Sequence, residues 1–322
     1  MTTETAPLVA IVGPTASGKS ALAVWLAERF QAEVISCDST QLYRGFDIGT
    51  AKPSLADRRG IPHHLIDVLD ASQQTTAGDY RALALPILAD LRRRHRLPIF
   101  AVGTGLYLRA LLEGLADLPQ RCEELRARLR KSTECHPSNY LHRMLQRLDP
   151  DAAARIAPAD QQKLIRAIEV CLLTSKPVSE LHRAGRAPLA GWKPLQLALL
   201  PPREPLYERI HARTDAMLAN GWLEEVRALV AGGLPENSKP FDFIGYRELR
   251  SVLHGLISLE DARATVHQST RRYAKRQLSW FRNLPGVQHF AGFGDHLSIQ
   301  TDVLRWLSQQ LASTHDAGSS GV

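Results

Sequence analysis

A glycine-rich segment near the N-terminus has the residue types and spacing of a phosphate-binding loop. It reads Gly13-Pro14-Thr15-Ala16-Ser17-Gly18-Lys19-Ser20 and fits the pattern G-x-x-x-x-G-K-S. Backbone N–H groups of such a loop converge on an anion, and its lysine adds a full positive charge. The sequence therefore predicts a binding site for a diphosphate or triphosphate at residues 13–20, with the Ser20 hydroxyl as a Mg²⁺ ligand. The loop alone does not specify the reaction.

Two further polar positions follow apolar runs that have the character of strands. Asp38 comes after residues 32–37, and Gly103-Thr104 come after residues 97–102. Ligand sites of parallel α/β sheets form at the carboxyl ends of the strands, so Asp38 is a candidate general base or Mg²⁺ ligand. The alternative is that Asp38 caps the turn that follows it. Thr104 either donates a hydrogen bond to a phosphate oxygen or is a turn residue. No Asp or Glu follows the second run, which is evidence against ordinary nucleotide hydrolysis.

The C-terminal third contains a long basic segment. Residues 262–294 have no Asp or Glu, and Tyr273, Trp280 and Phe281 are interleaved with six cations: Arg263, Arg271, Arg272, Lys275, Arg276 and Arg282. Cations neutralise phosphates and aromatic rings stack on bases, so this pattern predicts a surface that contacts RNA. The alternative is a solvated basic helix with its aromatic residues in the core. A net charge of +7 suits a polyanionic partner but is weak evidence by itself.

These residues must be positioned by alternating strands and helices. Apolar runs predict strands at residues 8–12, 32–37, 61–69 and 97–102, with helices at 21–30 and 76–94 between them. We therefore expect an α/β fold, a P-loop NTPase-like doubly wound parallel sheet. His63 and His64 would point to opposite faces of their strand, which favours structural contacts over a shared metal ion.

The character of the chain changes near residue 119. Long helical periods follow to about residue 175, and a strand signal returns at 193–200. We expect a catalytic core of residues 1–118 and 197–311 and an inserted all-helical domain of residues 119–196. Helices resume at 204–231 and 259–282, and residues 312–322 are predicted to be a disordered tail.

Composition excludes several classes of protein. The chain has 322 residues, of which 44% are hydrophobic and 23% are charged, as in globular proteins. Neither a secretory signal nor a membrane-spanning run is recognisable, so we expect no membrane association. The four cysteines have no C-x-x-C spacing, which favours a reduced, cytoplasmic protein without a zinc site.

Seven segments together resemble the tRNA dimethylallyltransferase (tRNA isopentenyltransferase) family of bacterial type. They follow the family order across almost the whole chain. The phosphate-binding loop at 13–20 is followed by Asp-Ser-Thr-Gln-Leu-Tyr-Arg-Gly at 38–45, Asp-Ile-Gly-Thr-Ala-Lys-Pro at 47–53, Gly-Ile-Pro-His-His-Leu-Ile-Asp at 60–67, Gly-Thr-Gly-Leu-Tyr at 103–107, Ile-Gly-Tyr-Arg-Glu-Leu at 244–249 and Ala-Lys-Arg-Gln-Leu-Ser-Trp-Phe-Arg at 274–282.

The resemblance implies transfer of a dimethylallyl group from dimethylallyl diphosphate to the N6 amine of the adenosine 3′ of the anticodon in tRNA. It implies a nucleotide-binding, ATP-binding type of loop that takes the donor diphosphate with Mg²⁺, and a monomer as the working form. Asp38 would accept the amine proton, Thr104 would bond the departing oxygen, and Arg213 would clamp the diphosphate. The implied contacts to the tRNA anticodon stem-loop are Asp38, Ser39, Thr40, Gln41, Arg126, Gln162, Lys163, Leu164, Ile165, Arg166, Asp242, Phe243, Ile244, Gly245, Tyr246, Arg247, Lys275, Arg276, Gln277, Trp280 and Arg282.

Two positions depart from the family pattern. Val102 stands where the family usually has a first of two glycines, and Lys163 stands where it usually has an arginine. Lysine lacks the bidentate fork of arginine, so an arginine-specific contact at position 163 is not expected.

Two other functions share some of these features. A small-molecule or nucleoside kinase would have the same loop and sheet, with phosphate-clamping arginines in the insertion. An RNA-binding module gated by a nucleotide would need a guanine-specifying Asn-Lys-x-Asp, which the sequence does not contain. Preference for dimethylallyl diphosphate over ATP would separate a dimethylallyltransferase from both alternatives.

Overall fold

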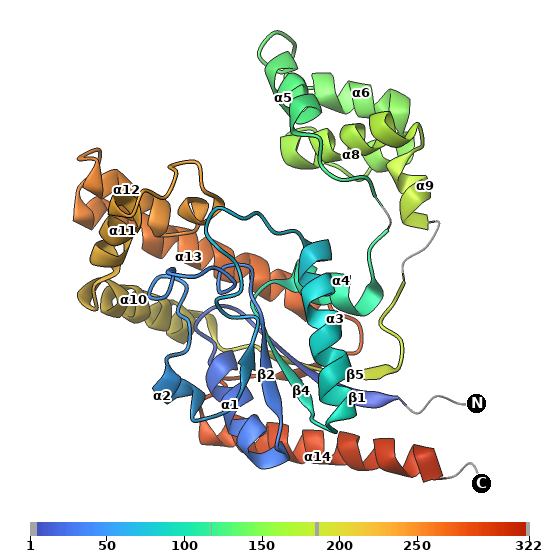
Figure 1. Ribbon diagram of the computed structural model, residues 1–322, viewed down its shortest axis with the longest axis vertical. Helices are drawn as coiled ribbons and strands as arrows, with labels where there is room; N and C mark the ends of the chain where they lie inside the picture. The colour runs from blue at the N-terminus through green and yellow to red at the C-terminus, as the bar shows by residue number, and fades with distance from the viewer. Residues whose placement is uncertain (1–4, 117, 184–186, 320–322) are drawn as a thin grey trace. The chain divides into compact units, whose positions relative to one another are not determined.

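The protein consists of two compact units, Met1–Leu112 with Ala190–Val322 and Glu113–Leu189. The structure is a computed structural model that describes residues 5–116, 118–183 and 187–319 (Figure 1). The first unit contains a parallel sheet and most of the helices, and the second is helical. Each unit is described by itself.

In the described part of the first unit, six parallel strands form one sheet with the order β3-β2-β4-β1-β5-β6. The α/β fold class predicted from the sequence is confirmed. The loops after β1, β2 and β4, which carry the predicted site, leave neighbouring strands at the same edge of the sheet. The strands are β1 Ala6–Val12, β2 Glu33–Cys37, β3 His63–His64, β4 Pro98–Val102, β5 Trp192–Leu199 and β6 Gln288–Phe290.

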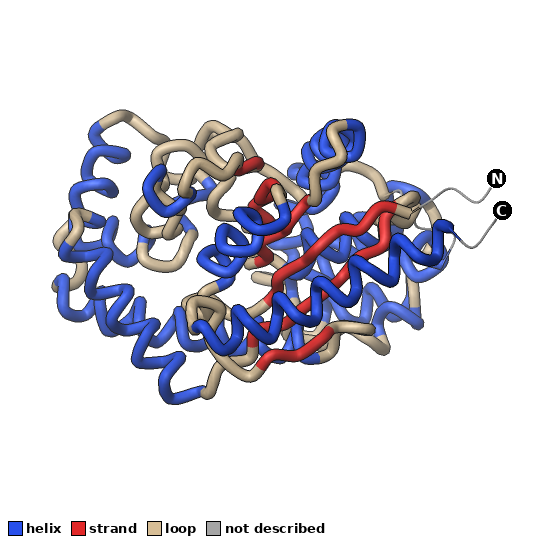
Figure 2. Tube along the Cα trace, turned by 90° about the horizontal axis from the view of Figure 1, so that it is seen from below, coloured by secondary structure: helices blue, strands red, loops and turns tan. Residues whose placement is uncertain are grey.

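Helices cover both faces of this sheet. Helices α1 (Lys19–Phe30) and α14 (Leu297–Ser319) pack on one face, where Leu22, Leu26 and Val303 share a core with apolar residues of β1 and β5 (Figure 2). The buried residues of α3 (Ala77–Arg93) lie outside that core, and the Tyr80 hydroxyl donates to the Ser36 carbonyl of β2 at 3.1 Å. A capping box starts α3, because Thr76 and Asp79 bond each other's backbone N–H groups.

The remaining helices of the first unit follow β4 and β5 or lie in the loops between strands. Helices α10 and α13 pack along each other, and α12 packs against α13 and α11. Their bounds are α2 Leu55–Arg58, α4 Gly105–Glu113, α10 Arg203–Ala219, α11 Trp222–Ala231, the 3₁₀ helix η1 Lys239–Asp242, α12 Tyr246–Leu253 and α13 Leu259–Arg282.

The second unit has its own apolar core. Helix α8 supplies more of its buried residues than any other helix, and Leu141 and Leu145 of α6 belong to the same core as Ile168 of α8. Asp160 caps α8 by accepting from the Lys163 N–H at 3.2 Å. Its helices are α5 Glu123–Ser132, α6 Tyr140–Leu148, α7 Pro150–Ala153, α8 Gln161–Thr174 and α9 Val178–Arg183.

Several boundaries differ from those expected. The second unit ends at Leu189, not at residue 196, because β5 pairs with β1 from Trp192 onward and so belongs to the sheet. The strand expected at 61–69 is only His63–His64 long, since Leu65 and Asp67 have positive φ angles. Gly221, with φ +92°, separates the helices expected as one at 204–231.

The C-terminal helix extends further than expected. Helix α14 continues to Ser319, although the sequence predicted disorder from residue 312, and the first glycine beyond that point is Gly318. Residues 320–322 lie outside the described residues. Among the helices of the described chain, none is both long enough and apolar enough to cross a membrane.

Candidate active site

The phosphate-binding loop joins β1 to α1 and surrounds a buried lysine. Gly18 precedes the helix with a φ of +84°, a conformation that glycine adopts without strain. Lys19 Nζ donates to the Pro14 carbonyl at 2.7 Å. Burial lowers the pKa of Lys19 from 10.5 to about 7; the Asp38 carboxylate opposes this shift and Arg213 adds to it. The loop therefore holds an ammonium group that an incoming anion would stabilise.

The ends of β2 and β4 are tied to each other beside this loop. The N–H groups of Gly103 and Thr104 both donate to the Cys37 carbonyl at 3.0 Å. The Ser39 N–H in turn donates to Thr104 Oγ1 at 3.0 Å. Asp38 is thereby placed next to Thr104, as the strand pattern predicted.

Asp38 has one engaged carboxylate oxygen and one that faces Gly103. Its Oδ1 accepts from the N–H and the hydroxyl of Thr40, at 2.9 and 2.7 Å. The capping role is therefore real, but it uses only one oxygen. A Cβ on Gly103 would lie 2.2 Å from Asp38 Oδ2, so position 103 has to be glycine for this carboxylate to keep its place. Val102 is the last residue of β4, fully buried and paired with Val12 and Cys37, so this departure from the family pattern lies within the sheet.

Arg213 reaches the same place from α10. Its Nη1 donates to Thr15 Oγ1 at 3.4 Å. Burial lowers the pKa of the Arg213 guanidinium, and Asp38 counteracts the shift. Lys19, Asp38 and Arg213 therefore lie within electrostatic range of each other, which sequence spacing could not reveal for Arg213.

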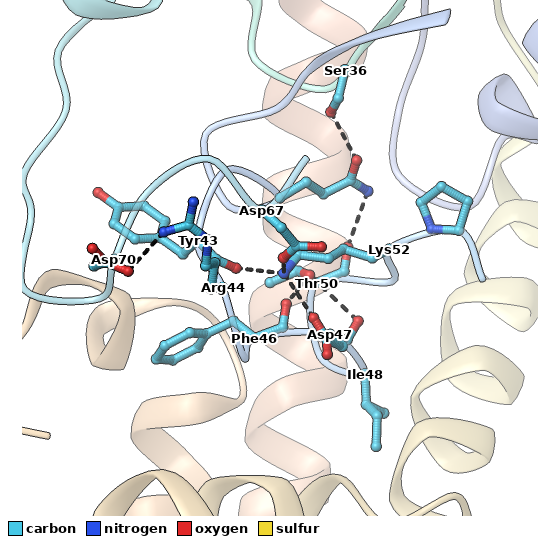
Figure 3. A network of polar contacts seen from close by, with 12 residues as sticks. Ser36, Tyr43, Arg44, Phe46, Asp47, Ile48, Thr50, Lys52, Asp67 and Asp70 are labelled. Carbon is cyan, nitrogen blue, oxygen red and sulfur yellow. Dashed lines mark hydrogen bonds and ion pairs between the residues drawn. The ribbon is translucent and has the colours of Figure 1, made fainter. Parts of the chain in front are cut away.

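The chain after Asp38 is stabilised by a buried lysine (Figure 3). The Lys52 side chain is 4% exposed, and its ammonium contacts Asp47 Oδ1 at 2.8 Å, the Asp67 carboxylate and the Tyr43 carbonyl. Two of the family-like segments, 47–53 and 60–67, had no role that could be assigned from the sequence. Their residues Lys52 and Asp67 hold the loop that carries the Asp38 turn.

Gln41 is also engaged within the protein. Its Oε1 accepts from the Ser36 hydroxyl at 2.8 Å, and its Nε2 donates to the carbonyls of Thr50 and Ala51, each at 3.3 Å. Figure 3 shows two of these partners, Ser36 and Thr50, in the same network as Lys52. Hydrogen bonds of Asp38, Ser39 and Gln41 thus hold the turn at residues 38–41 in place.

The predicted tRNA contacts separate into exposed and buried groups. In the first unit Asp242, Arg247, Lys275, Arg276, Trp280 and Arg282 are exposed. Phe243 is half-buried and packs on Tyr43 with ring centroids 5.7 Å apart, so segment 242–247 lies against the loop after Asp38. Four predicted contacts are instead core residues whose side chains are buried: Leu164, Ile165, Tyr246 and Gln277.

The arginines predicted to contact tRNA in the second unit surround a buried glutamate. Glu169 is fully buried, and Arg166 Nη1 contacts it at 2.7 Å and Arg126 Nη1 at 3.6 Å. The Cys122 N–H also donates to Glu169, at 2.7 Å. Gln162 and Lys163 are exposed at the start of α8, where Lys163 pairs with Asp160 at 2.6 Å. The lysine at position 163 therefore forms a local surface ion pair.

Gln277 of α13 links two parts of the site. It accepts from the Thr15 N–H at 2.8 Å and donates to the Gly103 carbonyl at 2.8 Å. Tyr273 donates to the same carbonyl at 3.2 Å. Sequence analysis missed the role of Tyr273 and treated Gln277 as an RNA contact. Their spacing of four residues, which places both on one helix face, was the available signal.

Ser20 offers one oxygen ligand for Mg²⁺. It is exposed in the first turn of α1, next to Lys19. Among the residues that the structure describes, no cluster of three or more His, Cys, Asp or Glu is placed to hold a metal ion. A single hydroxyl suits Mg²⁺ that takes its other ligands from a bound diphosphate and water, as Mg²⁺ commonly does.

Comparisons with known proteins identify relatives of the whole chain. A family model described as IPP transferase matches residues 41–284, and one described as Isopentenyl transferase matches residues 6–68. A tRNA dimethylallyltransferase of Solibacter usitatus is 50% identical over 91% of this chain and 95% of its own. The corresponding protein of Koribacter versatilis is 47% identical over 92% of this chain and 97% of its own.

Solved structures agree with these relatives. The full-length tRNA isopentenylpyrophosphate transferase from Bacillus halodurans has a TM-score of 0.72 and 36% identity, over 97% of this chain and 99% of that one. A eukaryotic dimethylallyltransferase described as acting on tRNA has a TM-score of 0.74 and 30% identity, over 85% of this chain and 69% of that one. This chain therefore belongs to the tRNA dimethylallyltransferase family, the isopentenyl transferases of tRNA.

Proposed function

We propose that this protein transfers the dimethylallyl group of dimethylallyl diphosphate to the exocyclic N6 amine of the adenosine 3′ of the anticodon in tRNA. The observation that carries the proposal is the convergence of Lys19, Arg213 and Asp38 at the carboxyl ends of the strands. Two cations suit a leaving diphosphate, and a carboxylate suits an amine that loses a proton. Family membership supplies the two substrates.

The donor would bind through the phosphate-binding loop. Backbone N–H groups of the loop other than that of Thr15, together with those at the start of α1, would bind its phosphates. Lys19 and Arg213 offset the charge that develops when the bond between the allylic carbon and oxygen breaks. Thr104, beside Asp38, would donate its hydroxyl proton to the departing oxygen in place of Ser39 Oγ, which now accepts it at 3.3 Å.

The acceptor amine would approach Asp38. An N–C bond forms as the C–O bond breaks, and the amine proton passes to Asp38 Oδ2, since Oδ1 already accepts two bonds from Thr40. The products are isopentenyladenosine in tRNA, diphosphate and one proton. The target base has to leave its stack to reach a strand-end site, so base flipping is part of the proposal.

Ser20 would hold Mg²⁺ together with the donor diphosphate. When bound, this ion would neutralise part of the charge on the leaving group. Exposed cations of α13 and of the helical unit would bind the phosphates of the anticodon stem-loop. We also propose that the protein works as a monomer in the cytoplasm.

Mass spectrometry of tRNA nucleosides tests the proposal directly. Unmodified tRNA is incubated with the protein, dimethylallyl diphosphate and Mg²⁺, then digested to nucleosides. We expect an adenosine that carries one added dimethylallyl group, formed at least about a hundredfold more slowly by an Asp38→Ala control. Transfer of the γ-phosphate of ATP to an acceptor, without any prenylated adenosine, would identify a kinase and refute the proposal.

A further inference from the structure

A single buried amide connects the two loops that form the active site. Gln277 is 6% exposed, its Oε1 accepts from the Thr15 N–H at 2.8 Å, and its Nε2 donates to the Gly103 carbonyl at 2.8 Å. Thr15 belongs to the phosphate-binding loop, and Gly103 precedes Thr104. The helix that supplies the amide, α13, belongs to neither loop.

The contacts on either side of this amide concern the proposed chemistry. Thr15 is the residue that Arg213 contacts, and Gly103 is the residue that Asp38 Oδ2 faces. The Thr15 N–H is occupied by Gln277, so it is not among the loop donors left for phosphate. Fixing these two backbone groups fixes the distance between the diphosphate-binding loop and the turn that holds Asp38 and Thr104.

A primary amide of this length can form both bonds. An ionised glutamate accepts from the Thr15 N–H but cannot donate to the Gly103 carbonyl, and methionine does neither. Tyr273 also donates to the Gly103 carbonyl, at 3.2 Å, so that carbonyl keeps a donor when the amide is lost, whereas the Thr15 N–H loses the bond to Gln277 Oε1. Loss of the amide therefore releases the phosphate-binding loop first.

We propose that Gln277 is a positioning residue that sets the spacing between the diphosphate-binding loop and the Asp38–Thr104 turn, and not a contact to tRNA. This inference deepens the proposed function and rests on it for the identity of the donor. The two hydrogen bonds of Gln277 are expected to affect diphosphate binding, which can be measured without the transfer reaction.

The test compares Gln277→Met with Arg276→Ala, its exposed neighbour on α13. Binding of inorganic diphosphate with Mg²⁺ is measured by calorimetry, and KM for tRNA and for dimethylallyl diphosphate by steady-state kinetics. Loss of two buried hydrogen bonds predicts a roughly 10- to 100-fold weaker diphosphate affinity in Gln277→Met, with KM for tRNA within about twofold of wild type. Arg276→Ala is expected to raise KM for tRNA and to leave the affinity for diphosphate unchanged. A raised KM for tRNA with unchanged diphosphate affinity in Gln277→Met would overturn the proposal.

A double-mutant cycle checks that Gln277 acts through the turn. If it positions Thr104, then Gln277→Met should lower kcat much less in a Thr104→Ala background than in wild type, since the group that it positions is gone. Fully additive effects would contradict that route.

Thermal unfolding monitors folding, and if Gln277→Met does not fold, Gln277→Glu replaces it. This variant keeps the Thr15 bond, so it should lower kcat while diphosphate affinity falls less than tenfold; an unchanged kcat would overturn the proposal.

The outcomes distinguish a failure of the positioning role from a failure of the proposed function. If diphosphate affinity falls in Gln277→Met but wild type modifies no adenosine, the positioning role stands and the acceptor is wrong. If wild type modifies tRNA and Gln277→Met retains both donor affinity and kcat, the positioning role is wrong and the function stands.

Discussion

The pKa of Lys19 predicts that diphosphate binding takes up a proton. Burial lowers this pKa from 10.5 to about 7, so the empty site holds the side chain as ammonium only in part near neutral pH. A bound diphosphate places negative charge beside the amine and favours the ammonium form. The perturbation that isolates this effect is Lys19→Met, which keeps the length of the side chain and cannot titrate.

The magnitude follows from the two pKa values. At pH 8.5 only about 3% of Lys19 is charged in the empty site, so diphosphate binding that restores the usual pKa takes up nearly one proton. At pH 7 about half of Lys19 is already charged, so binding takes up about half a proton. Above pH 7 the wild-type affinity should fall close to tenfold per pH unit relative to Lys19→Met. Returning the pKa from about 7 to 10.5 corresponds to roughly 4–5 kcal/mol, an upper limit to what the anion recovers.

Isothermal titration calorimetry with inorganic diphosphate provides the assay. Each protein is titrated at pH 8.5 and at pH 6 in two buffers of different ionisation enthalpy, at constant Mg²⁺, and the dependence on buffer gives the number of protons taken up. The ligand's own titration is common to both proteins, so the difference between them reports Lys19. Equal proton uptake by wild type and Lys19→Met at pH 8.5 would refute the reasoning that burial neutralises this lysine.

Substitutions at five positions test the other parts of the site. Asp38→Ala should lower kcat by roughly 10²–10⁴-fold with a smaller change in donor affinity, and full turnover would leave Asp38 as a turn cap only. Arg213→Ala should reduce transfer, and Arg213→Lys should restore it incompletely because the fork geometry is lost; normal kinetics in both would remove Arg213 from the site. Gly103→Ala should abolish most turnover in a protein that still unfolds near the wild-type temperature, because its Cβ would lie 2.2 Å from Asp38 Oδ2; near-wild-type activity would contradict this clash. The double substitution Lys275→Ala and Arg276→Ala should weaken tRNA binding. It should also reduce the slope of log affinity against log salt concentration by roughly 0.7–0.9 per lost phosphate contact. An unchanged slope would show that these two cations do not contact RNA phosphates.

The sequence predicted the sheet well because its signals were local. Strands β1, β2 and β4 are short apolar runs, each followed directly by a glycine or an aspartate. The helix from 259 to 282 begins and ends where its pattern predicted. The short strand β6 was missed because three residues carry little periodicity. The end of the helical insertion was placed at residue 196, inside the strand signal at 193–200, and the pairing of β5 with β1 from Trp192 onward assigns that whole strand to the sheet.

The site was harder to predict where contacts join residues far apart in the chain. Arg213 and Thr15 are almost two hundred residues apart, and no periodicity relates them. Lys52 resembles an exposed lysine in the sequence, yet its side chain is 4% exposed because Asp47, Asp67 and the Tyr43 carbonyl surround it. Gln277 was expected to contact tRNA because the family resemblance implied it for segment 275–282, whereas its side chain is 6% exposed.

Gly103 after β4 and Asp38 after β2 are coupled, because the Asp38 carboxylate lies where a side chain at position 103 would be. A hydrolase with this loop would place an acid after β4. In this protein the space beside Gly103 is taken by Asp38 Oδ2, which a Cβ at position 103 would approach to 2.2 Å. An aspartate or glutamate at 103 would therefore displace the carboxylate on β2 and add a second negative charge beside it. The absence of an acid at position 103, noticed in the sequence as evidence against hydrolysis, thus agrees with the position of Asp38. In the proposed reaction Asp38 Oδ2 would accept the proton of the incoming amine, a role that needs no second acid at position 103.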